Sequence, residues 1–250
     1  MRLPRLVRRL IDPVTERIPV PVVGGLNRGR FWNLASAGSG YATGRRAGPQ
    51  MALLHDLTGR GEVFWDVGAH HGYVTLMAAA RVGPEGHVEA FEPGLRNMRL
   101  LRRHLRWNRV ANATVRPLAL GAFEGEADFG GGDTSKMHAL GGGSERVTVR
   151  TGRSLIEAGT VAPPDVVKID VEGTEADVLE GLLDLAPPTA RFVVAIHSRR
   201  SDRACVALLR EHGFSVRATP ELERARRDGG AWPGDPDLVA VGPEGTDPRG

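Results

Sequence analysis

The stretch that decides the fold is Glu62-Val63-Phe64-Trp65-Asp66-Val67-Gly68-Ala69-His70-His71-Gly72-Tyr73. The apolar residues between Val63 and Val67 predict a strand that is covered on both faces, as in the centre of a parallel sheet. A helix-like pattern starts at Tyr73. Gly68 can take backbone angles closed to other residues and leaves the main chain open to a ligand, and Gly72 lets the helix begin close to the strand. The stretch therefore predicts a strand, a cofactor-binding turn and a helix in succession.

The spacing of the glycines favours a cofactor other than a dinucleotide. The turn reads Asp-x-Gly-x-x-x-Gly, one glycine short of the Gly-x-Gly-x-x-Gly loop that holds a pyrophosphate at a helix N-terminus. Asp66 can accept a hydrogen bond from an ammonium group, and Glu92, which follows the next predicted strand at 87–91, can bind both hydroxyls of a ribose. This pair suits S-adenosylmethionine. We expect the cofactor contacts at Asp66, Gly68, Ala69, Gly72, Glu92 and Ala119, the last beside the adenine ring at the end of a third strand.

Composition limits the class of protein. The 250 residues, 41% hydrophobic and 25% charged, suffice for one α/β domain with extensions. The net charge is +3, but residues 1–30 carry seven arginines against Asp12 and Glu16, which leaves the remainder near −2. With aromatic residues at 5% and no basic stripe among them, a nucleic-acid partner is not expected. The single cysteine, Cys205, and the lack of a run of ~20 apolar residues favour a cytoplasmic protein without a disulfide framework or a membrane span.

We expect two parts in the chain. Residues 1–48 form a lead-in. It begins with a short basic amphipathic helix, which could make weak peripheral contact with acidic lipid or pack on the domain, and continues as an irregular segment in which Phe31, Trp32 and Tyr41 are anchors or parts of a lid over the cofactor. Residues 49–245 form the main domain, interrupted by a flexible glycine-rich insertion at 130–144.

Helices and strands alternate through the main domain. Strands are expected at 63–67, 87–91, 113–118, 164–170, 191–196, 214–218 and 237–241, a hairpin at 127–129 and 146–151, and a rim loop at 219–236. The absence of a helix between the last two strands predicts that the final strand runs antiparallel. The pattern indicates an α/β, Rossmann-like, seven-stranded doubly wound sheet of the class I methyltransferase type.

Two sequence cassettes resemble those of the FkbM-type methyltransferases. They are Phe64-Trp-Asp-Val-Gly-Ala-His-His-Gly72 and Lys168-Ile-Asp-Val-Glu-Gly-Thr-Glu175, the second followed by Val178-Leu-Glu-Gly181. The resemblance spans roughly residues 40–215. It implies S-adenosylmethionine as donor and O-methylation of a hydroxyl on a sugar, polyketide or other small metabolite, with cofactor contacts at Asp66, Gly68, Gly72 and Glu92. Many relatives carry an acid before the histidine of the fifth strand, whereas Ala195-Ile196 precede His197 here.

The acceptor side of the site is expected at the carboxyl ends of the fourth and fifth strands. Lys168 and Asp170 share one face of a strand, Glu172 follows at the turn, and His197 projects from the neighbouring strand end. Methyl transfer requires in-line alignment and removal of a proton, so these four residues are the candidate catalytic groups. His197, with an ordinary pKa of ~6.5, suits a general base or a structural hydrogen bond. Asp170 can contact the donor, act as base or orient Lys168.

Several alternatives remain beside this interpretation. Asp170, Glu172 and His197 could hold a divalent metal, although a metal-independent enzyme is favoured. Glu175 and Asp177 are explained by the favourable electrostatics of a helix N-terminus. A nicotinamide-dependent oxidoreductase is disfavoured by the missing glycine, and a non-catalytic cofactor-binding or scaffold protein with the same fold is the third possibility.

Overall fold

The computed structural model of the chain describes residues 14–36, 40–45, 48–130, 139–140, 143, 145–227, 232 and 235–245. The predicted basic helix near the N-terminus and most of the glycine-rich insertion at 130–144 therefore lie outside the described residues.

A seven-stranded sheet forms the centre of the molecule, with the strand order β12-β13-β11-β10-β3-β4-β5. The pairs from β11 through β5 are parallel, whereas β13 runs antiparallel to both of its neighbours. This arrangement confirms the predicted doubly wound sheet with an antiparallel last strand. The strands are β3 Val63–Val67, β4 His87–Phe91, β5 Ala113–Arg116, β10 Val166–Ile169, β11 Arg191–Ala195, β12 Ser215–Ala218 and β13 Asp237–Val241.

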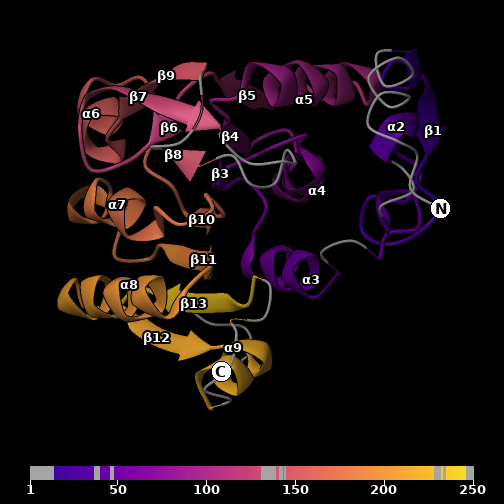
Figure 1. The fold of residues 1–250 in the computed structure, drawn as a ribbon. Helices are drawn as coiled ribbons and strands as arrows, with labels where there is room; N and C mark the ends of the chain where they lie inside the picture. The colour runs from indigo at the N-terminus through magenta and orange to yellow at the C-terminus, as the bar shows by residue number, and fades with distance from the viewer. Residues whose placement is uncertain are drawn as a thin grey trace.

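Helices cover both faces of this sheet (Figure 1). Because side chains alternate along a strand, the fully buried Phe64 and Trp65 of β3 enter two different cores. The core with Phe64 is closed by α3 Gly48–Leu57, α4 Tyr73–Val82 and α5 Leu95–Trp107. The core with Trp65 is closed by α6 Gly152–Glu157, α7 Glu175–Glu180, the 3₁₀ turn Leu183–Leu185 and α8 Arg199–Glu211.

A second, smaller sheet lies beside the first. The predicted hairpin is confirmed as the antiparallel pair of β7 Gly125–Gly130 and β9 Glu145–Arg150. Two short strands that the sequence did not indicate, β6 Ala119–Leu120 and β8 Ala139–Leu140, complete the order β6-β9-β7-β8. Ala119 is thus fixed by pairing with β9.

The segment between the last two strands differs from the prediction. Instead of a rim loop throughout 219–236, a helix, α9, spans Pro220–Arg227 and buries Leu222 and Ala225. Its proline stands at the first helical position, where the ring fits and no intrahelical hydrogen bond is lost. Acidic residues in its first turn and arginines in its last turn complement the helix dipole. The proline that suggested a loop therefore starts a helix.

Part of the lead-in forms an antiparallel hairpin, β1 Pro19–Pro21 with β2 Phe31–Asn33, followed by one short turn, α2 Leu34–Ser36. Trp32 is fully buried, and its ring stacks on His104 of α5 with the ring centroids 3.8 Å apart. The hairpin is thereby fastened to the helix that follows β4. Among the described residues, no helix has both the length and the apolar character needed to cross a membrane.

Candidate functional site

A cavity of about 660 Å³ opens at the carboxyl ends of β3, β4 and β10. Its volume lies within the range of small-molecule sites, and β3 and β10 flank the point where the strand order reverses, which is where open α/β sheets bind ligands. Seven of the ten predicted site residues line it: Gly68, Ala69, Glu92, Ala119, Lys168, Asp170 and Glu172. The other three, Asp66, Gly72 and His197, lie behind this lining.

Both glycines of the turn have left-handed backbone angles, with φ of 75° at Gly68 and 85° at Gly72. A Cβ at Gly68 would lie 2.0 Å from the carbonyl oxygen of Asp170, and one at Gly72 would lie 2.2 Å from Cδ1 of Leu101. The backbone angle therefore favours glycine at both positions, and at Gly68 the close approach of the Asp170 backbone also excludes a side chain.

The amides of this turn are already hydrogen-bonded within the protein. Gly68 and Ala69 donate to the carbonyl of Phe91, each at 3.0 Å, Gly72 donates to the carbonyl of Ala69 at 2.8 Å, and His70 donates to Oε2 of Glu92 at 2.7 Å. A pyrophosphate-binding loop needs such amides directed at the phosphates. The turn is therefore built for a ligand without a pyrophosphate.

Glu92 is held at the cavity wall by three protein donors. Its Oε2 accepts from His70, and its Oε1 accepts from the amide of Gly94 at 2.9 Å and from Nδ2 of Asn97 at 3.2 Å. Burial raises the pKa of Glu92 to about 7 despite these bonds. An ionised carboxylate offers about four acceptor positions, so a ligand hydroxyl can still bind here.

Asp66 and Lys168 form a buried ion pair beneath the turn. Lys168 Nζ lies 3.1 Å from Oδ1 of Asp66 and donates at 2.7 Å to the carbonyl of Gly68, while Oδ2 of Asp66 accepts from Thr75 at 2.6 Å. Burial would lower the pKa of Lys168, but the carboxylates of Asp66 and Asp170 raise it above its usual value. Lys168 is therefore a permanent ammonium group that ties β3 and the turn to β10.

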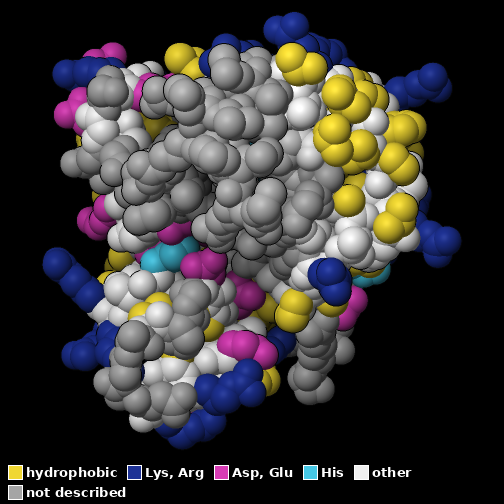
Figure 2. Space-filling view, turned by 45° about the vertical axis from the view of Figure 1, so that its right-hand side comes forward, with side chains coloured by type: hydrophobic (Ala, Val, Ile, Leu, Met, Phe, Trp, Pro, Cys, Tyr) yellow, Lys and Arg dark blue, Asp and Glu magenta, His cyan; other side chains and the backbone are white. Residues whose placement is uncertain are grey.

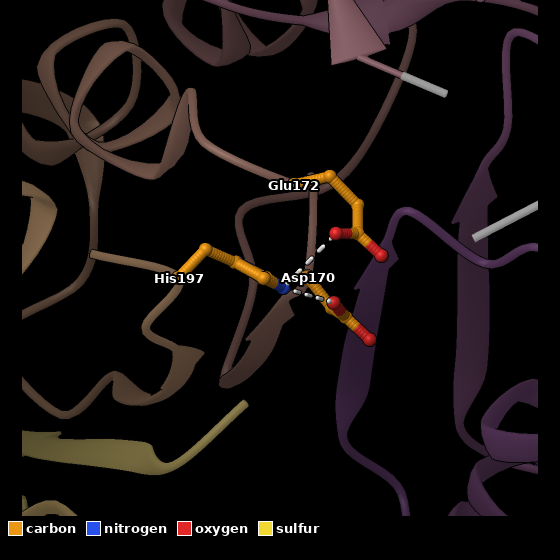
Figure 3. Close-up of side chains that lie close together, drawn as sticks. All are labelled: Asp170, Glu172 and His197. Carbon is orange, nitrogen blue, oxygen red and sulfur yellow. Dashed lines mark ion pairs between the residues drawn. The ribbon is translucent and has the colours of Figure 1, made fainter. Parts of the chain in front are cut away.

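His197 faces the carboxylates of Asp170 and Glu172, which follow β10 (Figure 3), and its other ring nitrogen meets Glu175 of α7. Its Nδ1 is 2.6 Å from Oε1 of Glu175, while its Nε2 is 3.5 Å from Oδ1 of Asp170 and 3.6 Å from Oε2 of Glu172. Burial would lower the pKa of His197, but the hydrogen bond to Glu175 and the neighbouring carboxylates raise it to about 9. The imidazole ring is therefore positively charged at neutral pH, and this charge offsets the negative charges of Asp170 and Glu172.

Beside its expected place at a helix N-terminus, Glu175 has a contact with His197 that the sequence did not indicate. It does begin α7, but its side chain is fully buried: Oε1 accepts from His197 and from the amide of Gly173 at 2.7 Å, and Oε2 accepts from Ser201. Burial would raise the pKa of Glu175, but these bonds lower it. The signal available in the sequence was the position of Glu175 at the end of the second cassette.

The cavity is strongly acidic, and acidic side chains gather beside a histidine on one face of the molecule (Figure 2). Asp237 accepts from Gln50 at 2.7 Å, and burial raises the pKa of Asp237, as it does that of Glu172, to about 7. Lys168 and Arg45 supply basic side chains. The carboxylates that line the cavity are Glu92, Asp170, Glu172, Glu221, Asp235 and Asp237, of which the last two and Glu221 were not predicted.

Comparison with known proteins shows the family to which the chain belongs. The model of the methyltransferase FkbM domain matches residues 66–216, from the end of β3 to the start of β12. The chain belongs to the FkbM methyltransferase family. As an FkbM methyltransferase it uses S-adenosylmethionine to methylate a small molecule, which confirms the predicted family and cofactor and sets aside the nicotinamide alternative.

Two relatives illustrate the match. The chain is 30% identical over 184 residues to the hexuronic acid methyltransferase AglP of Haloferax volcanii, an alignment that covers 71% of this chain and 72% of that protein. The fold is similar to that of precorrin-6y C5,15-methyltransferase from Geobacter metallireducens, with a TM-score of 0.52, 14% identity, and coverage of 78% of this chain and 89% of that one. The comparison with the precorrin-6y methyltransferase shows only that the FkbM methyltransferase shares its fold.

Proposed function

We propose that this FkbM methyltransferase transfers the methyl group of S-adenosylmethionine to a hydroxyl group of a sugar or sugar acid. The observation that carries the proposal is that Glu92 and the pair Asp170 and Glu172 line one cavity of about 660 Å³. One carboxylate thus serves the donor side and two serve the acceptor side. The similarity to a hexuronic acid methyltransferase supports a sugar as the acceptor.

The residues of the donor side fit S-adenosylmethionine. Glu92 can accept a hydrogen bond from the ribose, the open face of Gly68 and Ala69 lets the ligand approach the main chain, and Ala119 offers an apolar wall for the adenine. The acidic lining favours the positive charges of the ligand. Once bound, the sulfonium supplies an electrophilic methyl group. Asp66, Gly72 and Lys168 act by holding the turn in place, since their contacts are with protein groups.

The acceptor side favours a hydroxyl over an amine. Carboxylates such as Asp170 and Glu172 accept hydrogen bonds from hydroxyl groups and can align them with the methyl group. An amine between the same carboxylates would be held as an ammonium ion, which has no lone pair for the attack. His197, fixed by Glu175, orients the two carboxylates. O-methylation is therefore the favoured reaction, and N-methylation its nearest variant.

A substrate screen tests this proposal. Purified protein is incubated with S-adenosylmethionine carrying a labelled methyl group and with separate pools of neutral sugars, hexuronic acids, amino sugars and aromatic alcohols. We expect label in the sugar or hexuronic acid pools, and an O-methyl resonance in the product by NMR. Label only on the nitrogen of an amino sugar, or only in an aromatic alcohol, would contradict it.

A further inference from the structure

Three potential metal-ligating atoms converge at the cavity wall. A carboxylate oxygen of Asp170, one of Glu172 and a ring nitrogen of His197 all lie within 4.8 Å of one another. The distances from Nε2 of His197 to the two carboxylates, 3.5 and 3.6 Å, are longer than those of hydrogen bonds. The three atoms therefore face a common point, with ion-pair contacts but no hydrogen bonds between His197 and the two carboxylates (Figure 3).

The buried nitrogen of His197 is a second, independent sign of a ligand. Within the described part of the chain, its Nε2 is buried and has no hydrogen-bond partner. Its Nδ1 is fixed at 2.6 Å by Glu175, which is itself fully buried and held by Ser201 and Gly173. A carboxylate on one ring nitrogen that orients the other toward a cation is the usual arrangement of metal-binding histidines.

The two oxygens of the Asp170 carboxylate have different neighbours, and this difference also suits a cation. Its Oδ2 lies 3.8 Å from the ammonium group of Lys168, whereas its Oδ1 faces His197. Lys168 thus occupies the far oxygen and leaves the near one directed at the common point. A further carboxylate, that of Asp235, has its Oδ1 at 3.5 Å from Nε2 of His197, so the charge around this point is strongly negative.

We propose that Asp170, Glu172 and His197 bind one divalent cation of the Mn²⁺ or Mg²⁺ type, with the Nε2 proton of His197 released to water as the ion binds, and that this cation in turn binds oxygen atoms of the methyl acceptor. Two carboxylates and one imidazole form an oxygen-rich set of ligands, which favours these cations over zinc, whose sites are richer in nitrogen and sulfur. Asp170 and Glu172 line the cavity, so a cation between them is accessible to a ligand. The acceptor part of this proposal rests on the proposed function; the metal part does not.

The cation explains how an acidic cavity accepts a sugar acid. An anionic acceptor is repelled by the surrounding carboxylates, but a cation can bind its carboxylate and a neighbouring hydroxyl together. The cation makes the bound hydroxyl more acidic, and its proton leaves to water. The methyl carbon then forms a bond to that oxygen as the carbon–sulfur bond breaks, and the electron pair of the broken bond stays on the sulfur.

Mn²⁺ alone is the probe for the site, so the test needs no acceptor. The full-length protein is stripped with EDTA and titrated with Mn²⁺, and the free ion is followed by electron paramagnetic resonance. We expect one bound ion per chain, lost in Asp170→Asn, Glu172→Gln and His197→Ala. Glu175→Gln should weaken binding by about 10- to 100-fold, as removal of a partner of a metal-binding histidine does. His55→Ala is the matched control, because His55 pairs with Asp56 on the surface.

Each outcome decides the metal proposal separately from the function. Calorimetry with S-adenosylmethionine shows that each variant is folded, because that site uses Glu92 on the other side of the cavity. Mn²⁺ binding that is absent, or that is equal in His55→Ala and in the three ligand variants, overturns the metal site even if sugars are methylated. Specific Mn²⁺ binding without any sugar methylation supports the site and contradicts the proposed function. Glucuronic acid should further change the resonance of the bound Mn²⁺; an unchanged resonance contradicts the acceptor part.

Discussion

The two sides of the cavity differ in how their polar groups are satisfied. On the side of β3 and β4, the turn amides bond to Phe91, Ala69 and Glu92, and Asp66 bonds to Thr75. On the side of β10 and β11, Nε2 of His197 faces two carboxylates at distances beyond a hydrogen bond. The backbone of the turn on the donor side is thus held by the protein itself, although both ring nitrogens of His71 on that side have no hydrogen-bond partner among the described residues; we propose that a bound ligand completes the acceptor side.

This difference predicts which substitutions affect chemistry and which affect stability. Polar groups that are bonded within the protein support the fold, so their loss should appear in unfolding experiments. Groups that await a ligand should affect turnover with little loss of stability. The following predictions test that division, from the largest expected effect to the smallest.

The largest effect is expected from His197→Ala on turnover. With an acceptor in hand, the rate should fall by about 10²–10⁴-fold, the range for losing assistance to proton removal, because His197 holds Asp170 and Glu172 in place, while the affinity for S-adenosylmethionine stays unchanged. Single-turnover kinetics with labelled donor measure the rate. If the cation site is correct, Asp170→Asn costs as much, EDTA abolishes activity and Mn²⁺ restores it. Full turnover in His197→Ala would remove this residue from the reaction.

Lys168→Met should instead act on the fold. It leaves the fully buried Asp66 without its ammonium partner, and breaking such a buried pair costs about 3–5 kcal/mol of unfolding free energy. Urea unfolding followed by circular dichroism measures the change. The double variant Asp66→Asn/Lys168→Met should lose less unfolding free energy than the two single variants lose together, because neither charge is then left without its partner. The control Arg146→Met removes a partner from an exposed pair with Glu126 and should change little.

Glu92→Ala tests the ligand contact of the preformed side. Loss of a hydrogen bond to a charged group costs about 1.5–3 kcal/mol, so we expect the affinity for S-adenosylmethionine to fall by about 10- to 150-fold. Isothermal titration calorimetry measures it, with the exposed Glu85→Gln as control. Equal affinities in the two variants would show that Glu92 only holds the turn.

The smallest effect is a pH dependence from His104. Its Nδ1 donates to the carbonyl of His71 at 2.7 Å and its Nε2 accepts from the amide of Asn33 at 3.2 Å, so the bonded ring is neutral. Burial lowers the pKa of His104 to about 4 from 6.5. The unfolded chain therefore takes up a proton first, and this contribution to stability is complete above pH 6.5 and lost as the pH falls toward 4.

Between pH 8 and pH 5.5, the contribution of His104 to the unfolding free energy should fall by about 1.4 kcal/mol. Urea unfolding of the unchanged protein and of His104→Gln at both pH values isolates this contribution, because the other titrating groups are common to the two proteins. If the variant keeps the same pH dependence, other groups are responsible. Because His104 joins the hairpin to the turn and takes up its proton in the folded protein only near pH 4, fluorescence of the buried Trp32 should respond near that pH.

The sequence by itself determined the strand, the glycine turn and the family, because each depends on residues close together in the chain. The Asp-x-Gly-x-x-x-Gly spacing and the second cassette are local signals, and buried parallel strands are recognised by their apolar runs. The convergence of Asp170, Glu172 and His197 also followed, since neighbouring parallel strands end at the same edge of the sheet.

Only the tertiary structure decided which way each polar side chain faces and what it meets. Asp66, a predicted ligand contact, is fully buried, and its carboxylate meets Thr75 and Lys168. Glu175 became the partner of His197 only because α7 packs on α8, which carries Ser201. Asp237 reached the cavity because β13 inserts antiparallel beside β11, which brings the start of the last strand to the carboxyl edge of the sheet. Such contacts join residues far apart in the chain, and burial, which no local pattern records, decides whether a carboxylate faces water, a ligand or another side chain.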